Sequence, residues 1–217
     1  MKIRVLLADD HTVLREGLKY ILEAQRDITV IGEASDGREA VERVVTLKPD
    51  VVVMDISMRD LNGIEATEIL SQSCPFSKIV ILSIHAKAEY VNRALRSGAR
   101  GYVLKESASK EVIDAVRQVQ TGGRYLSDKI MDAVVDDYIA SDLGTIKKSP
   151  IESLSLRERQ VLQLVVEGHT SIKIAEIIGI SVKTVETYRS RMMQKLGVGD
   201  VISLVKYAIR HGLTTID

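Results

Sequence analysis

The sequence predicts an α/β domain with a doubly wound parallel sheet, followed by a second, all-α domain. Two patterns lead to this fold class. Over residues 1–121, five short apolar runs of strand length alternate with five amphipathic stretches of helical length. From Leu154 to the end of the sequence the pattern is purely helical. The 217 residues are enough for two small domains, each with its own core.

The predicted strands and helices alternate in chain order. The strands are the apolar runs at residues 3–8, 28–34, 51–54, 79–84 and 101–104, and the helices cover residues 12–25, 37–47, 63–71, 87–97 and 109–121. Strands that alternate with helices form parallel sheets whose two faces are covered by those helices. Five such repeats predict a flavodoxin-like domain with a five-stranded parallel sheet.

A further helix and a polar linker separate the two domains. Residues 126–140 (LSDKIMDAVVDDYIA) have the pattern of an amphipathic helix, and the following SDLGTIKKSP at 141–150 combines Gly, Ser and Pro with polar residues. We therefore divide the chain into a first domain at 1–122, a linker region at 123–150 that includes the helix at about 126–140, and a second domain at 151–217.

Composition predicts a cytoplasmic protein without a membrane segment. Cys74 is the single cysteine, so no internal disulfide can form, as is typical of intracellular proteins. No run approaches the ~18 to 20 apolar residues of a membrane helix. Residues 147–217 contain 11 Lys and Arg and 7 Asp and Glu, whereas residues 1–146 contain 19 Lys and Arg and 23 Asp and Glu. A basic second domain is compatible with nucleic-acid binding, although so small a difference is also typical of a solvated surface.

Polar residues follow four of the predicted strands. Asp9 and Asp10 follow the first, Asp55 follows the third, Ser83 lies near the end of the fourth and Lys105 follows the fifth. Each alone has an ordinary explanation, such as a helix cap, a turn residue or a surface charge. Because the carboxyl ends of parallel strands meet at one edge of a sheet, all should converge. Three carboxylates at one place repel one another, which predicts a compensating lysine and a hard, oxygen-liganded ion such as Mg²⁺.

This combination of groups is suited to phosphoryl chemistry. A carboxylate beside Mg²⁺, a lysine and a hydroxyl can attack a phosphoryl group and hold it as an acyl phosphate. Mg²⁺ and Lys105 would neutralise the phosphoryl oxygens, and Ser83 would hydrogen-bond one of them. Asp55 is the candidate nucleophile.

Residues 1–122 resemble the receiver domain of bacterial two-component response regulators. The resemblance is carried by VLLADDH at 5–11, VVVMDISM at 51–58, NG at 62–63, ILSIH at 81–85 and SGARGYVLKES at 97–107. In that family a partner histidine kinase supplies the phosphoryl group, which implies that Asp55 is the phosphorylation site. The resemblance also implies that Asp9, Asp10 and Asp55 bind Mg²⁺ (or Mn²⁺), with the backbone carbonyl of Ser57 completing the coordination.

Three positions correspond to the family's switch, and two depart from its pattern. The resemblance implies that Ser83 and Lys105 sense the phosphoryl group and that Tyr102 is the aromatic switch residue, although Tyr102 also fits a half-buried strand aromatic. Arg59 stands where the family usually has proline, and Ile84 where it often has a small residue. We interpret Arg59 either as tuning metal affinity or phosphoryl lifetime or as a solvent-exposed loop charge. Ile84 is expected to restrict access by small phosphodonors and water.

The second domain has the spacing of a helix-turn-helix. In SIKIAEIIGISVKTVETYRS (171–190), Ala175 allows two helices to approach closely, Gly179 permits the turn, and Val185 packs the second helix on the first. A plain helical hairpin is the alternative. The outer face of the second helix, at about 182–196, is basic and polar, which favours a helix that lies in the major groove of DNA.

Residues 154–198 resemble the LuxR-type tetrahelical DNA-binding domain, through LSLRERQVL, IAEIIGIS, KTV and KLGV. A receiver followed by this domain is the architecture of the NarL/FixJ class of response regulators. The resemblance implies base contacts from Glu186, Thr187 and Ser190, and we assign phosphate contacts to Lys183, Thr184, Arg189, Arg191 and Lys195. The predicted last helix, at 198–213, would support dimerisation on inverted half-sites.

These features predict a DNA-binding transcriptional response regulator. Phosphorylation of Asp55 by a histidine kinase would promote a homodimer that binds inverted half-sites of double-stranded DNA, with RNA polymerase as a possible further partner. We expect no enzymatic activity beyond self-phosphotransfer onto Asp55 and autodephosphorylation. The alternatives are an aspartyl-phosphate-type phosphohydrolase, a regulator of RNA, and a constitutive or adaptor protein that phosphorylation does not control.

Overall fold

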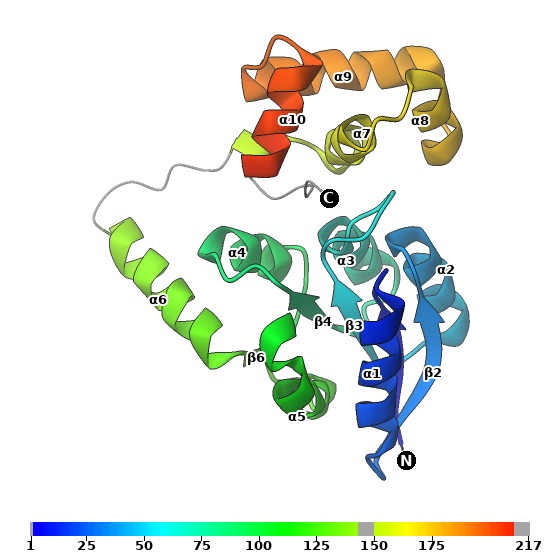
Figure 1. Cartoon of the computed structure of the whole chain (residues 1–217), viewed down its shortest axis with the longest axis vertical. Helices are drawn as coiled ribbons and strands as arrows, with labels where there is room; N and C mark the ends of the chain where they lie inside the picture. Colours follow the sequence, from blue (N-terminus) through cyan, green and yellow to red (C-terminus); the bar gives the residue numbers. More distant parts are fainter. Residues whose placement is uncertain (1, 143–149, 211–217) are drawn as a thin grey trace. The chain divides into compact units, whose positions relative to one another are not determined.

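The chain is organised in two compact units, Met1–Ile146 and Lys147–Asp217. Their architecture (Figure 1) comes from a computed structural model that describes residues 2–142 and 150–210, without the side chains of 137–142, 152, 209 and 210. Most of the polar segment predicted at 141–150 lies outside the described residues, and so does the end of the helix predicted at 198–213.

A parallel sheet forms the centre of the first unit, with the strand order β2-β1-β3-β4-β5-β6. The strands are β1 (Ile3–Ala8), β2 (Ile28–Ala34), β3 (Val51–Asp55), β4 (Lys78–Ser83), β5 (Gly101–Leu104) and β6 (Tyr125–Leu126). The predicted doubly wound parallel sheet is confirmed, but it has six strands rather than the predicted five. The extra strand β6 extends the edge by pairing with Gly101 and Tyr102 of β5. A strand of two residues is too short to show a hydrophobic period.

Helices cover both faces of this sheet (Figure 1). They are α1 (Thr12–Glu23), α2 (Gly37–Leu47), α3 (Gly63–Ser73), α4 (Ala88–Arg96) and α5 (Ala108–Gln120), with a short 3₁₀ turn η1 (Lys105–Ser107) before α5. In β3, Val51 and Val53 pack against α1 and α5, whereas Val52 and Met54 pack against α2, α3 and α4. Because both of its faces are buried, β3 is apolar without alternation until it reaches Asp55 at the carboxyl edge.

The helix predicted at 126–140 is α6 (Asp128–Asp142), and it begins directly after β6. Ile130 is fully buried in the same core as Tyr90 and Val91 of α4, and α6 packs along α4. Residues 123–142 of the predicted linker region therefore belong to the first unit. Strand β6 and helix α6 continue the fold of the sheet domain.

In the part of the second unit that the structure describes, four helices surround one core. They are α7 (Leu156–Val166), α8 (Ser171–Ile178), α9 (Val182–Leu196) and α10 (Val201–Arg210), preceded by a 3₁₀ turn η2 (Pro150–Ser153). The α8–α9 pair has the predicted helix-turn-helix form. Ala175 and Val185 are buried between the helices, and Gly179 ends α8 with φ 73°, a left-handed conformation that glycine adopts without strain.

Throughout residues 2–142 and 150–210, no helix combines the length and the apolar character needed to cross a bilayer.

Candidate functional site

Two buried carboxylates share one lysine at the carboxyl edge of the sheet. Asp9 follows β1 and Asp55 ends β3, and these strands are hydrogen-bonded neighbours. Asp9 is 2% exposed and Asp55 is 1% exposed. The Nζ atom of Lys105 lies 3.0 Å from Oδ2 of Asp9 and 2.9 Å from Oδ2 of Asp55. The structure therefore brings together three of the residues that the sequence predicted for this site.

Burial and neighbouring charges have opposing effects on the pKa values of Asp55 and Lys105. Burial raises the pKa of Asp55, and the charge of Asp9 raises it further, while Lys105 and the main-chain N–H of Ser57 oppose both effects. Burial lowers the pKa of Lys105, but attraction to Asp55 and Asp9 outweighs burial and leaves this pKa raised. One lysine does not neutralise two carboxylates, so the site has a remaining demand for positive charge.

The donor atoms at this edge fit a hard divalent ion. Asp9, Asp10, His11 and Asp55 each offer a ligand atom, and these atoms all lie within 4.8 Å of one another. Carboxylate oxygens are the ligands that Mg²⁺ prefers, and the half-buried Asp10 leaves the group open to solvent on one side. The coordination by the carbonyl of Ser57 stays a prediction.

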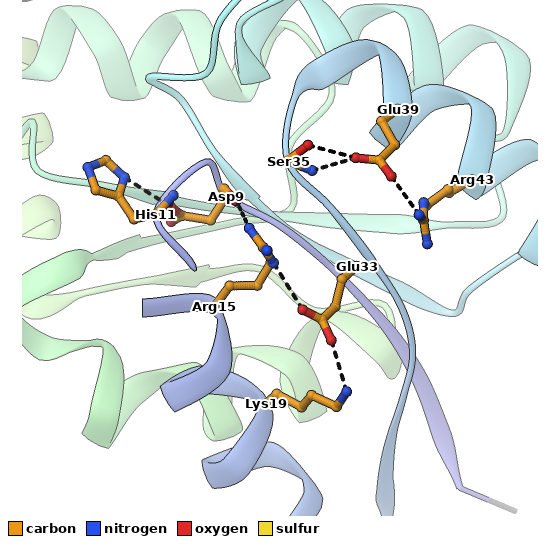
Figure 2. A network of polar contacts seen from close by, with 8 residues as sticks. All are labelled: Asp9, His11, Arg15, Lys19, Glu33, Ser35, Glu39 and Arg43. Atoms are coloured by element: carbon orange, nitrogen blue, oxygen red, sulfur yellow. Dashed lines mark hydrogen bonds and ion pairs between the residues drawn. The ribbon is translucent and has the colours of Figure 1, made fainter. Parts of the chain in front are cut away.

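His11 belongs to this cluster although the sequence analysis did not single it out. Its Nδ1 atom lies 2.8 Å from Oδ1 of Asp10 and 3.1 Å from Oδ1 of Asp9, and its main-chain N–H donates to the same Asp9 oxygen (2.8 Å). Figure 2 shows the imidazole turned back towards Asp9. The position directly after an acidic pair was the only signal for it.

The loop after Asp55 requires its Asn-Gly pair. The side-chain oxygen of Asn62 caps α3 by accepting from the N–H groups of Ile64 (3.0 Å) and Glu65 (3.1 Å). A Cβ atom on Gly63 would lie 1.9 Å from the carbonyl oxygen of Asp55, so another residue here would push the end of β3 aside. Arg59 is exposed in the same loop, and its influence on the site stays a prediction.

Ser83 and Tyr102 lie on neighbouring strands beside Asp55. Ser83 is fully buried at the end of β4, and its Oγ accepts a hydrogen bond from the main-chain N–H of His85 (3.1 Å). Tyr102 of β5 is also fully buried, and burial raises the pKa of its phenol. The Tyr102 hydroxyl reaches the β4–α4 loop, where it donates to the carbonyl of His85 (2.7 Å). The imidazole of His85 stacks on Tyr90, with ring centroids 4.2 Å apart.

Helix α9 presents most of the predicted DNA contacts to solvent. The exposed residues are Lys183, Glu186, Thr187, Ser190, Arg191 and Lys195, whereas Thr184 and Arg189 are half-buried. The opposite face buries Val185, Met192 and Leu196 in the core. The hydroxyls of both threonines are engaged within the helix, because Thr184 joins the cap formed by Ser181 and Thr187 donates to the carbonyl of Lys183 (2.9 Å).

Three predicted DNA contacts have partners on other helices of the second unit. Glu186 accepts a hydrogen bond from Ser171 at the start of α8, and Nη1 of Arg189 donates to the same hydroxyl (2.9 Å). The Nζ atom of Lys195 lies 2.6 Å from Oε2 of Glu158, a buried carboxylate of α7. Sequence spacing on one helix does not reveal such cross-helix pairs. The DNA contacts of these residues stay predictions.

The sequence of the first unit matches the family of response regulator receiver domains over residues 5–117, more than half of the chain. The chain belongs to this family. Residues 152–208 of the response regulator match the luxR family of bacterial regulatory proteins, which places a DNA-binding domain after the receiver. Both family assignments made from the sequence motifs are therefore confirmed.

The chain is similar to known proteins over nearly its whole length. The response regulator is 37% identical to the transcriptional regulatory protein DegU of Brevibacillus brevis over 223 residues, which cover 97% of this chain and 94% of the relative. It is 38% identical to the oxygen regulatory protein NreC of Staphylococcus aureus over 214 residues, which cover 97% and 99%. Among solved structures, the complex of the response regulator RcsB with DNA is 25% identical, with a TM-score of 0.60 and coverage of 95% and 98%.

In this response regulator, strand β5 connects the edge that carries Lys105 to the start of α6. Strand β5 carries Tyr102 and is followed directly by Lys105. The main-chain N–H of Leu104, at the end of β5, donates to Oγ of Ser127 (3.3 Å), and Ser127 in turn donates to the carboxylate of Glu111 in α5. The N–H of Ser127 donates to the carbonyl of Tyr102 (3.1 Å). The start of α6 is thus hydrogen-bonded to the strand that carries Tyr102.

Ile84, the second departure from the family pattern, follows directly after Ser83. Ile84 is 64% exposed and lies between the buried Ser83 and the stacked ring of His85. We predicted from the sequence that this side chain restricts access by small phosphodonors and water. Its effect on those reactions stays a prediction.

Proposed function

We propose that this response regulator is switched by phosphorylation of Asp55, with a histidine kinase as the phosphodonor, and that the switch controls its binding to double-stranded DNA. The bridge from Lys105 to the buried Asp9 and Asp55 supports this proposal most directly. A lysine held between two carboxylates at the carboxyl edge of a parallel sheet stabilises an incoming phosphoryl group as well as the ionised nucleophile. We propose no other catalytic activity, and a cytoplasmic location.

In the proposed reaction, a carboxylate oxygen of Asp55 attacks the phosphorus of a phosphohistidine. A P–O bond forms, the P–N bond breaks, and its electron pair returns to the imidazole of the kinase, which takes up a proton. Lys105 stands beside the attacking oxygen and neutralises charge on the transferred group. Mg²⁺ (or Mn²⁺), held by Asp9, Asp10 and Asp55, would supply further positive charge to the phosphoryl oxygens when bound.

The proposed switch works through residues that contact the phosphoryl group and the adjoining strand. Lys105 and Ser83 would turn from their present partners to the phosphoryl oxygens, which changes the loop that Tyr102 holds through His85. Strand β5 then passes the change to Ser127 and α6, the helix that precedes the DNA-binding domain. A phosphoryl group shifts such a two-state equilibrium because it contacts one state better than the other.

The proposed output is DNA binding by α9 in a homodimer on inverted half-sites. The solvent-facing basic residues of α9 support a position in the major groove. The response regulator RcsB, which aligns with nearly the whole chain, has been solved in complex with DNA, and this supports DNA binding as the output. Dimerisation, RNA polymerase contact and the positions of individual base contacts are parts of this proposal that rest on family resemblance.

Intact-mass spectrometry tests the phosphoacceptor directly. The full chain is incubated with Mg²⁺ and either a histidine kinase that has phosphorylated itself or a small acyl phosphate. We expect the wild type to gain the mass of one phosphoryl group, and Asp55→Asn to gain none. Asp60→Asn, a change in the same loop, serves as the control and should be phosphorylated like the wild type. Equal labelling of Asp55→Asn and wild type would refute the assignment, and sustained turnover of a phosphate ester would favour a phosphohydrolase.

A further inference from the structure

Both the main-chain N–H and the main-chain carbonyl of Asp9 are hydrogen-bonded to neighbouring elements. Its N–H donates to the carbonyl of Ala34 at the end of β2 (3.1 Å). Its carbonyl accepts a hydrogen bond from Nη1 of Arg15 in α1, at 2.6 Å (Figure 2). These two bonds fix the direction in which the chain leaves β1 and enters the acidic pair Asp9–Asp10.

Arg15 is itself held by a neighbouring strand. Its side chain is 14% exposed, and Nε donates to Oε2 of Glu33 in β2 (2.9 Å). The other oxygen of Glu33 accepts from Nζ of Lys19, one turn further along α1 (2.9 Å). Glu33 lies opposite Leu7 in the register of β1 and β2, so the clamp is built on the rigid sheet. Figure 2 shows the resulting chain of contacts from Lys19 through Glu33 and Arg15 to Asp9.

The contacts of Arg15 lie at a helix that begins without a side-chain cap. Helices α2 and α3 begin with Asp36 and Asn62, whose side chains accept main-chain N–H groups and fix the entry of the chain. Helix α1 follows His11, which makes no such cap, because its imidazole is turned to the acidic pair instead. The connection between β1 and α1 therefore has no side-chain cap, and the bond from Arg15 to the carbonyl of Asp9 joins α1 to this connection instead.

We propose that Arg15, oriented by Glu33, is a positioning residue that prepares Asp9 and Asp10 for a divalent cation. The inference rests on the proposed function, because that function assigns the acidic pair to Mg²⁺. Groups that orient metal ligands from outside the coordination shell influence affinity strongly, since a preformed ligand set spares the ion the cost of assembling it. Arg15 does this through the main chain of Asp9 and touches neither carboxylate.

The sign of the effect separates positioning from simple electrostatics. Arg15 carries a positive charge close to the ion site, so removal of its charge alone would strengthen the binding of a cation. Removal of a positioning bond would weaken it. Lys19 offers a matched comparison, because it has the same charge, lies on the same helix and contacts the same Glu33, but makes no bond to Asp9.

The test is a calorimetric titration of the unphosphorylated full chain with Mg²⁺ at fixed ionic strength. We expect Arg15→Met to raise the Kd for Mg²⁺ about tenfold. Lys19→Met should bind Mg²⁺ as tightly as the wild type or more tightly. Glu33→Gln, which loosens Arg15 without removing it, should give a smaller loss. Thermal unfolding in EDTA shows whether each variant is folded at the titration temperature.

Two further variants keep the inference falsifiable. If Arg15→Met does not fold, Arg15→Lys and Glu33→Gln replace it, and wild-type affinity in both would overturn the inference. In folded Arg15→Met, affinity equal to or above that of the wild type would overturn it as well. Asp9→Asn tests the metal site itself. If Asp9→Asn loses Mg²⁺ binding and Arg15→Met does not, only the inference fails; if Asp9→Asn binds like the wild type, the metal site of the proposed function fails and takes the inference with it.

Discussion

The hydroxyl of Tyr102 donates a hydrogen bond to the main-chain carbonyl of His85, with 2.7 Å between the two oxygens. The buried ring of β5 thereby holds the loop that follows Ser83, and the imidazole of His85 stacks on Tyr90 of α4. One aromatic side chain thus connects the predicted phosphoryl-sensing serine with both β5 and α4. If Tyr102 is a switch residue, as the family resemblance implies, it acts on this loop through the bond to His85.

We predict that Tyr102→Phe separates phosphorylation from its output. Loss of the hydroxyl leaves the His85 carbonyl without this donor, which should lower the free energy of unfolding by about 1 kcal/mol. Asp55 should still be phosphorylated at the wild-type rate, because Tyr102 does not touch the nucleophile. The gain in DNA affinity on phosphorylation should shrink, as measured by fluorescence anisotropy. An undiminished gain would show that the bond has no part in the switch.

Lys105→Met should impair both stability and phosphorylation. The change leaves Asp9 and Asp55 buried together without their shared cation, which we expect to lower the free energy of unfolding by about 3 kcal/mol in the absence of Mg²⁺. Lys110→Met, an exposed site on α5, is the matched control and should behave like the wild type. Chemical denaturation measures the first effect, and intact-mass spectrometry measures the second.

The pH dependence of this variant has a defined sign. The pKa of Asp55 is raised in the folded chain above the ordinary value of 3.8, first by burial and then by Asp9. A carboxyl of this kind favours the folded state below its unfolded pKa, and this contribution is lost as the pH rises through the folded pKa. Because Lys105 opposes this rise, the pKa of Asp55 in the folded chain should be higher still in Lys105→Met. The stability difference between Lys105→Met and the wild type should therefore grow from pH 4 to pH 7, and a constant difference would contradict the account.

Substitution of Lys183 should affect DNA binding, whereas substitution of Lys195 should affect stability. Lys183 is exposed at the start of α9, and Lys183→Ala should reduce the slope of log affinity against log salt by about 1, without loss of stability. Lys195 pairs with the buried Glu158, so Lys195→Ala should lower the melting temperature of the second unit. Equal melting temperatures for the two variants would mean that the pair with Glu158 contributes little.

Ser127→Ala should weaken the connection between β5 and α6. The hydroxyl accepts from the N–H of Leu104 and donates to Glu111, and both bonds are lost with it. We expect normal phosphorylation of Asp55 and a smaller increase in DNA affinity afterwards. Ser109→Ala, an exposed serine in α5, is the control. If Ser127→Ala responds to phosphorylation like the wild type, the signal does not pass through this contact.

The site residues could be predicted because their positions follow from simple rules. An apolar run that ends in a polar residue places that residue at the carboxyl edge of a parallel sheet. This rule predicted that Asp9, Asp55 and Lys105 lie close together, and the structure confirms it. The Asn62–Gly63 pair was one of the motifs that carry the receiver resemblance, although only the structure reveals that the Asp55 carbonyl approaches Gly63 too closely for any side chain.

The contacts that sequence reasoning missed join side chains across separate elements. Arg15 bonds a main-chain carbonyl six residues away, and Glu33 reaches it from another strand, so neither forms a pattern within one helix or strand. The same is true of Glu186, whose acceptor role towards Ser171 depends on how α8 and α9 pack. Strand β6 was missed because two residues show no period. Each of these depends on tertiary packing, which hydrophobic periodicity does not specify.

The central claim is that phosphorylation of Asp55 controls DNA binding, and one anisotropy titration tests it. The probe is a labelled DNA duplex selected from a random pool by the phosphodonor-treated chain. Wild type and Asp55→Asn are titrated with and without a small acyl phosphate and Mg²⁺. The account predicts a clear gain in affinity for the treated wild type and no change for Asp55→Asn. Equal affinity of the treated and untreated wild type, with phosphorylation verified by mass, would contradict it.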